Sequence, residues 1–229
     1  MTTISPTATI ADLVIEEPGR ARVFERLGLD YCCGGKKSLH DACDRRGLDV
    51  DAVLSALATG NAGMGADHVE RLSPGELCDH IVSAHHERLR TELPRLSALW
   101  EKVVRAHGVE RDELLEVRAT FELLRTELEQ HTAEEEKTLF PACRTLAETG
   151  RAPAGLLDEL PGLEGDHDGA GRLLERLAEL TDNYDLDRSM CNTHRAALDS
   201  LRELQADLHV HIHEENNVLF PWVRAAANL

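Results

Sequence analysis

One short pattern occurs twice in this chain and strongly limits what the chain can fold into. A histidine, a glutamate four residues later and then Leu-Phe-Pro stand at residues 131–141 and again at 211–221. Residues four apart lie on the same face of an α-helix, so each His/Glu pair can point at one place. The repeat therefore predicts two helices that each bring an imidazole and a carboxylate to a common site.

The apolar residues that precede each pair indicate which way these side chains point. They recur every three or four positions, and in the first copy this rhythm continues to His131 and Glu135. In the second copy it continues to His211 and Glu215. Because a helix of a globular protein turns such a stripe toward the core, all four polar side chains should be buried.

Two further helical segments carry a histidine on their apolar stripe. His167 interrupts the stripe of one segment, and His86 interrupts that of another, one turn before Leu89. We favour His86 over its neighbour His85, which would take its place if the helix were rotated. The agreement of four separate stripes argues against the alternative of isolated structural histidines or exposed acidic helix faces.

Burying four imidazoles and two carboxylates without partners would cost several kcal/mol for each group. Bound metal ions would remove this cost, and neutral His nitrogens with Glu oxygens suit iron, manganese or zinc. Inward-facing carboxylates and histidines on opposing helices form the dinuclear sites of four-helix bundles. We therefore predict two metal ions bridged by the glutamates, with an open coordination position. The expected ligands are His86, His131, Glu135, His167, His211 and Glu215.

Capping and breaking residues place this site in a bundle of long helices. The run Ser73–Glu76 contains a serine N-cap, a proline at the first helical position and a glutamate three residues after the cap. Four antiparallel helices with short connections are expected at 74–107, 111–148, 157–181 and 189–226. Within them, a kink or a helix end is expected at Pro94, Pro141 and Pro221.

The chain ahead of the bundle has a different character. Residues 1–58 read as a small domain of short helices broken by glycines, and a glycine-rich stretch at 59–72 reads as a linker. The bundle then occupies 73–229. The predicted fold is all-α, an antiparallel four-helix bundle preceded by a small helical domain.

Charge and composition exclude several classes of function. The 42 acidic and 25 basic residues give a formal net charge of -17, which disfavours binding to nucleic acid or to anionic membranes. No apolar run approaches the ~20 residues of a transmembrane helix, and the first residues do not resemble a signal peptide. We therefore expect a cytoplasmic protein whose six cysteines are mostly reduced.

The remaining histidines fit no such site. His209 and His213 lie off the stripe and are expected to be solvated or to stand behind the ligands. His107 continues a stripe but lies about 31 Å along the helix from His86 at 1.5 Å per residue, which makes it a helix-end or core histidine. No group of potential ligands is expected around four others: His40, His68, His80 and His194.

Two adjacent cysteines, Cys32 and Cys33, stand out in the small domain. The glycines behind them should expose the sulfurs, and the nearby Lys36 and Lys37 should favour thiolates. We interpret the pair as a transient thiol site that accepts electrons, iron or a nitrosyl group; the alternative is a tight turn that packs small side chains. The other four are expected to be buried small residues: Cys43, Cys78, Cys143 and Cys191.

The bundle with its His and Glu ligands resembles a hemerythrin-like domain. In oxygen-carrying hemerythrins the third helix has two histidines spaced by four, but here Gly171 follows His167 at that distance. Their last helix places an aspartate five residues after the histidine, where this chain has Glu215 four after it. The resemblance implies a di-iron centre that is more open than a reversible oxygen carrier needs.

The small domain indicates which family of hemerythrin-like proteins the chain resembles. Asp30-Tyr31-Cys32-Cys33-Gly34-Gly35-Lys36, together with the last-helix motif at 215–221, is similar to the repair of iron centres (RIC) family over nearly the whole chain. The family implies two non-haem iron ions, oxo- or carboxylate-bridged, on the six positions that the stripes select. It also implies repair of iron–sulfur clusters after nitrosative or oxidative damage.

Several mechanisms fit these expectations. The centre would either donate iron to damaged iron–sulfur proteins with help from Cys32 and Cys33, or bind and reduce nitric oxide enzymatically. A hemerythrin-like sensor of oxygen or nitric oxide without repair activity is the alternative from another class, and a structural zinc site is a further one. The arrangement as a monomer or homodimer is left open.

Overall fold

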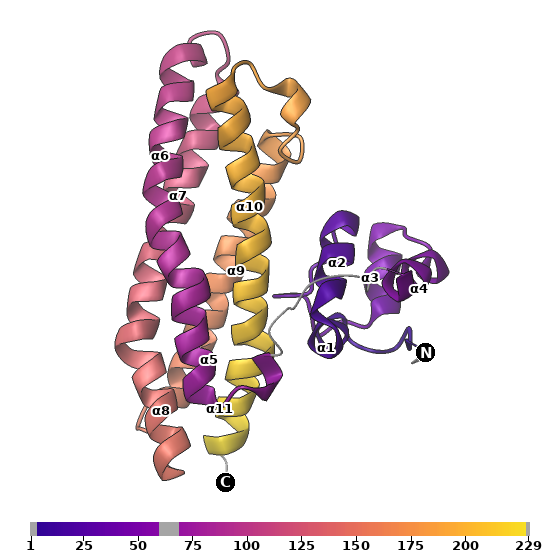
Figure 1. Cartoon of the computed structure of the whole chain (residues 1–229), viewed down its shortest axis with the longest axis vertical. Coiled ribbons are helices and arrows are strands. Elements are labelled where there is room, and N and C mark those ends of the chain that lie inside the picture. The colour runs from indigo at the N-terminus through magenta and orange to yellow at the C-terminus, as the bar shows by residue number, and fades with distance from the viewer. Residues whose placement is uncertain (1–3, 60–68, 228–229) are drawn as a thin grey trace.

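The computed structural model describes residues 4–59 and 69–227, which form helices joined by turns and loops (Figure 1). The only β-type pairing within them is an isolated bridge between Thr9 and Ser38. Most of the linker expected at 59–72 lies outside the described residues. None of the described helices is both long and apolar enough to span a bilayer.

Four long arms form the bundle, and they confirm the expected all-α, four-helix fold. α7 packs against α6 and α9, and α10 packs against α6. The arms consist of α5 (Pro74–Ile81), η3 (Val82–His86) and α6 (Glu87–His107); α7 (Glu113–Glu134), η4 (Glu135–Leu139) and α8 (Phe140–Thr149); α9 (Leu156–Leu180); and α10 (Asn192–Glu214), η6 (Glu215–Leu219) and α11 (Phe220–Ala227). Short 3-10 turns precede the first and last arms: η2 (Val69–Arg71) and η5 (Leu186–Arg188). The capping box expected at the start of α5 forms, with Ser73 and Glu76 bonded to each other's backbone amides.

Three of the arms contain a π-helical turn, η3, η4 and η6. In each turn the closing N–H reaches a carbonyl five residues back; Phe140, for example, donates to Glu135. Pro141 and Pro221 come directly after η4 and η6, where the missing proline N–H is tolerated in the first turn of the next helix. A kink or a helix end was expected at Pro94; no helix end lies there, because α6 continues through this solvent-facing proline. Because proline has no N–H, one backbone carbonyl of the preceding turn lacks its helical hydrogen bond, and on this solvent-facing side it can bond to water.

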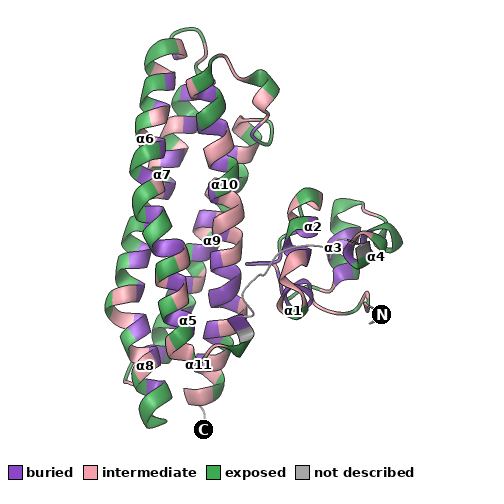
Figure 2. Ribbon diagram, in the orientation of Figure 1, coloured by how far each residue is buried: buried purple, intermediate pink, exposed green. Residues whose placement is uncertain are grey.

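A polar layer divides the bundle core into two apolar clusters. One cluster contains Trp100, Phe121 and the leucines that face them. The other contains Ile81, Phe140, Phe220 and their neighbours. Buried residues follow the inner side of each arm through both clusters (Figure 2). The predicted ligands occupy the layer between the clusters, as the interrupted stripes require.

The small domain has its own core and consists of short helices: α1 (Ile10–Glu16), η1 (Pro18–Arg20), α2 (Ala21–Leu27), α3 (Leu39–Arg46) and α4 (Val50–Thr59). Thr9 and Ser38 cap the starts of α1 and α3 with their side chains. Gly28 and Gly47 end α2 and α3 with positive φ angles, which glycine adopts without strain. The breaks expected from the glycines therefore lie at helix ends.

The small domain lies beside α10 (Figure 1) and is held there by the segment that carries the two cysteines. His213 donates from Nδ1 to the carbonyl of Tyr31 at 3.1 Å, and Asn217 donates to the carbonyl of Cys32 at 3.1 Å. The ring of Tyr31 meets His209 and His213 edge-on. His213 is therefore buried between the domains, and the expectation that it is solvated or stands behind the ligands is wrong.

We predict that Phe121→Ala lowers the free energy of unfolding by about 3–5 kcal/mol, because it leaves a cavity in the apolar cluster that contains Trp100. Phe121 is 0% exposed, whereas Leu123 in the same helix is 50% exposed. Leu123→Ala is the matched control and should change stability by about 0.5 kcal/mol or less. Denaturant unfolding of both variants measures the difference, and equal losses would contradict the assignment of this face to the core.

Candidate metal centre

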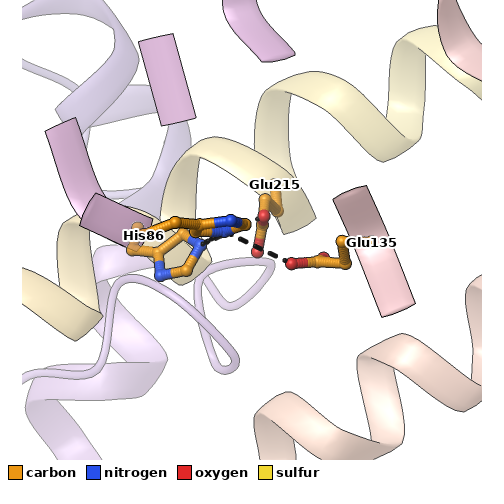
Figure 3. A group of neighbouring side chains, drawn as sticks. His86, Glu135 and Glu215 are labelled. Atoms are coloured by element: carbon orange, nitrogen blue, oxygen red, sulfur yellow. Dashed lines mark hydrogen bonds and ion pairs between the residues drawn. The ribbon is translucent and has the colours of Figure 1, made fainter. Parts of the chain in front are cut away.

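The structure brings all six predicted ligands together in the polar layer. Their ligand atoms form two groups, and within each group the atoms lie within 4.8 Å of one another: His86, Glu135, His211 and Glu215, and His131, Glu135, His167 and Glu215. Glu135 and Glu215 belong to both groups. Figure 3 shows His86, Glu215 and Glu135 pointing toward one another from three different arms. The arrangement offers each of two cations a pair of histidines and a share of both carboxylates.

Each carboxylate lies between imidazoles of different arms. The Oε1 of Glu135 lies 3.3 Å from His131 Nε2, and its Oε2 lies 3.5 Å from His86 Nε2. The two oxygens of Glu215 lie 3.1 Å from the Nε2 atoms of His211 and His167. Both glutamates are 0% exposed. The geometry is therefore that of two carboxylates set to bridge a pair of ions.

Hydrogen bonds at the far side of three rings set the direction of their lone pairs. Acceptor oxygens lie at the Nδ1 atoms of His86, His131 and His167, and they belong to Glu136 at 2.7 Å, Asp166 at 3.3 Å and Asn216 at 2.9 Å. A neutral imidazole that donates from Nδ1 has its lone pair on Nε2. The Nε2 lone pairs of these rings therefore point into the centre, as metal ligation requires.

The centre holds more hydrogen-bond acceptors than donors. Such an excess is expected where the acceptor atoms bind cations. Both oxygens of Glu135 and one oxygen of Glu215 are buried without a hydrogen bond from the described part of the chain. His131 Nε2 and His167 Nε2 face each other at 2.9 Å. Two lone pairs at that distance repel unless a positive charge lies between them or beside them. The donor set therefore fits metal ions of the iron, manganese or zinc type.

The pKa values in the ion-free centre follow the same electrostatics. Burial lowers the pKa of His131, but the adjacent carboxylate of Glu135 outweighs this effect and raises the pKa to about 9. Burial raises the pKa of Glu215, but the charge of His211 and the adjacent ring of His167 hold it well below its usual range. Both shifts indicate that the site favours positive charge next to its carboxylates.

A small cavity of about 10 Å³ adjoins the centre, with His131, His167 and His211 in its wall. This is about the volume that one water molecule needs. Gly171, four residues after His167 on α9, has no side chain that could add a further ligand. The centre therefore has room for a water-sized ligand next to its histidines.

Two further histidines, His85 and His80, lie near the centre. His85 is buried but lies outside both groups, and its ring stacks on that of His211 at 5.1 Å. The expectation that His80 has no potential ligands around it is wrong, because its ligand atom lies within 4.8 Å of those of His85 and Glu214. The π-helical turn η3 brings these two histidines together, and a regular helical wheel does not show this.

Cys32 and Cys33 do not join the centre. Their sulfurs lie 3.9 Å apart, and a Cβ atom at Gly171 would lie 4.0 Å from the Sγ of Cys33. Cys33 is therefore next to α9, one helical turn from His167. Asp30 organises the segment by accepting from the amides of Cys32 and Gly34.

The expected exposure and thiolate character of Cys32 are wrong. Cys32 is buried, and a hydrogen bond with Cys33, burial and the carboxylate of Asp30 raise the pKa of its thiol well above the usual range. Lys36 pairs with Glu164 at 3.8 Å. Among the other four cysteines, Cys191 is exposed rather than buried, because it caps the start of α10.

Comparisons with known proteins agree with this geometry. Residues 79–223 match the model of the hemerythrin HHE cation-binding domain, and residues 6–60 match a domain of unknown function (DUF542). The bundle is therefore a cation-binding domain of the hemerythrin type.

Similar chains match over almost their full lengths. Iron-sulfur cluster repair protein YtfE of Musicola paradisiaca is 36% identical over 93% of this chain and 94% of that protein. The protein of the same name from Yersinia pseudotuberculosis is 35% identical over 93% and 95%. Iron-sulfur cluster repair protein ScdA of Staphylococcus haemolyticus is 31% identical over 95% and 98%.

We predict that Asn216→Ala weakens metal binding by about 10–100-fold, because His167 loses the oxygen that holds its Nδ1–H. Asn216→Asp keeps an acceptor at that position and is the matched control, with affinity close to that of the wild-type protein. Competition with a chelator of known affinity measures both. Equal affinity of the alanine variant and the wild-type protein would contradict a role for Asn216 in orienting the ring.

Proposed function

This chain belongs to the repair of iron centres family of iron–sulfur cluster repair proteins, and on that basis we propose that it restores damaged clusters with two non-haem iron ions held in its bundle. The six ligands are His86, His131, Glu135, His167, His211 and Glu215. The observation that carries the proposal is the pair of four-residue groups that share two fully buried carboxylates. When bound, the iron pair would supply exchangeable iron and open positions for a diatomic ligand.

The side chains of the centre have separate tasks in this proposal. Glu135 and Glu215 neutralise the ions and hold them next to each other. The oxygens behind His86, His131 and His167 orient three of the rings. His211 Nδ1 is a buried atom with no hydrogen bond from the described residues. The ring of His211 is therefore the least restrained of the four and the easiest to move when an ion leaves.

We assign Cys32 and Cys33 to the passage of iron toward a damaged client protein. Their two sulfurs are close enough to approach a single ion after small rotations, and Cys33 is only half-buried. The absence of a side chain at Gly171 keeps the space between Cys33 and α9 clear. The raised pKa of Cys32 keeps its thiol protonated until a cation displaces the proton.

Metal analysis tests the centre directly. Protein purified without oxygen should contain about two iron ions per chain with a coupled ferric Mössbauer spectrum, because two ions share both carboxylates. The double variant Glu135→Ala, Glu215→Ala should lose them. Glu134→Ala, on the exposed face one residue away, is the control and should keep them. Iron that is absent from the wild-type protein, or unchanged in the double variant, would overturn the proposed centre.

A labelling experiment separates iron donation from reduction of nitric oxide. The protein is loaded with ⁵⁷Fe and mixed with an iron–sulfur protein whose cluster has been damaged by nitric oxide. Donation predicts that the label enters the repaired cluster in step with the recovery of that cluster. Reduction predicts that the label stays in the bundle while nitrous oxide accumulates over many turnovers when electrons are supplied.

The same assay tests the cysteines. Cys32→Ala, Cys33→Ala should keep the iron but transfer it much more slowly, since the donor centre is intact and the accepting sulfurs are gone. Cys191→Ser, which changes the exposed cysteine at the start of α10, is the control and should transfer iron normally. Normal transfer by the double variant would remove the cysteines from the mechanism.

A further inference from the structure

A second group of potential ligands lies outside the dinuclear centre. It consists of His80, His85 and Glu214, whose ligand atoms lie within 4.8 Å of one another. His80 Nε2 lies 3.5 Å from one oxygen of Glu214, and His85 Nε2 lies 3.4 Å from the other. We infer that these three side chains form a third cation site, which binds a single Fe²⁺ ion on its way to or from the dinuclear centre. This role, though not the site itself, rests on the function proposed above.

The chemistry of the group matches a known class of site. Two histidines and one carboxylate with open positions on one side form the facial arrangement that binds ferrous iron in non-haem enzymes. The His85 and Glu214 residues are each 5% exposed. His85 Nε2 and Glu214 Oε2 are buried without a hydrogen bond from the described residues. A cation between them would satisfy both atoms.

His85 is also oriented in the way that metal-binding histidines usually are. Its Nδ1 donates to Asp207 at 3.2 Å, which leaves the Nε2 lone pair directed at Glu214. His86 and His131 have the same relation to Glu136 and Asp166 in the dinuclear centre. The third group thus repeats the carboxylate–histidine pairing of the first two.

The local backbone explains how adjacent residues can serve two different sites. In a regular helix, residues five apart point about 140° away from each other, since each residue turns the chain by about 100°. His80 and His85 nevertheless have ring centroids 5.9 Å apart, because the π-helical turn η3 lies between them. The same turn directs His86 into the dinuclear centre.

The site opens toward solvent on the side where the small domain lies. A cavity of about 610 Å³ between the two domains is lined by His80, His85 and Glu214. The lining contains four carboxylates and two arginines, so it is acidic on balance: Glu25, Glu203, Asp207 and Glu214, with Arg22 and Arg88. Arg88 pairs with Glu203 and Asp207, which leaves Glu214 as the carboxylate available to a cation. An ion could therefore enter from solvent and reach this site before the buried centre.

The third group is also in contact with the dinuclear centre. The rings of His85 and His211 are parallel within 5° and their centroids are 5.1 Å apart. His211 is the ligand whose Nδ1 has no hydrogen bond from the described residues. A rotation of His211 would transfer the ion between sites by exchange of ligands. No electron moves in this step, and the ion keeps its charge.

Cobalt binding tests the site, because Co²⁺ takes the same ligands and has a visible spectrum. Chelator-treated wild-type protein should bind about three Co²⁺ ions per chain, and His80→Ala should bind about two. His80 has 21% of its side-chain area exposed, so its removal should leave the fold intact. His40→Ala, an exposed histidine in the small domain, is the matched control and should bind as many ions as the wild-type protein. Because Co²⁺ binds a given site more tightly than Fe²⁺, only a large excess of Fe²⁺ should release the third Co²⁺ ion.

A wild-type protein that binds no more Co²⁺ than His80→Ala would overturn the third site, even if the dinuclear centre stands. The isosteric Glu214→Gln repeats the test with little change in packing. The variant Glu135→Ala, Glu215→Ala should retain about one Co²⁺ ion, so loss of the third site and loss of the dinuclear centre are distinguishable. In the ⁵⁷Fe assay, His80→Ala should release iron more slowly; an unchanged rate would overturn the transfer role.

Discussion

Two carboxylates that have no contact with solvent face four imidazoles in the middle of the bundle, and the rest of the structure is arranged around that charge. A buried, unpaired carboxylate is among the most unfavourable groups that a core can contain. Apolar clusters enclose the layer on both sides, so the charge of the carboxylates has to be balanced within the layer, by the imidazoles and by bound cations. The need for positive charge explains why every arm contributes to the layer and why the layer is so well enclosed.

The helix geometry is adapted to the same requirement. In a regular α-helix the residue number fixes both the direction in which a ligand points and its position along the helix axis. The π-helical turns η3, η4 and η6 lie at or beside ligands in three of the arms. π-Helical turns inside α-helices are frequent at functional sites. Here η3 places two adjacent histidines, His85 and His86, in different polar groups.

The two domains meet where the chemistry of the bundle is accessible. The segment with Cys32 and Cys33 contacts α10 through the carbonyls of Tyr31 and Cys32, and Cys33 lies against α9. The cavity with the third ligand group is lined by residues of the same two domains. The small domain therefore lies next to both the cysteine segment's contact with α10 and the third ligand group.

The sequence by itself determined the four helices, their inward faces and the six polar residues that interrupt the apolar stripes, because the spacing of apolar residues along a helix is a local property. It did not reveal Glu136, Asp166 and Asn216, which orient the rings, since these contacts join different arms. It also led us to expect an isolated His80 and an exposed Cys32. Only the tertiary structure decided these points, because they depend on a π-helical turn that shifts the helical register and on the packing of the small domain against α10.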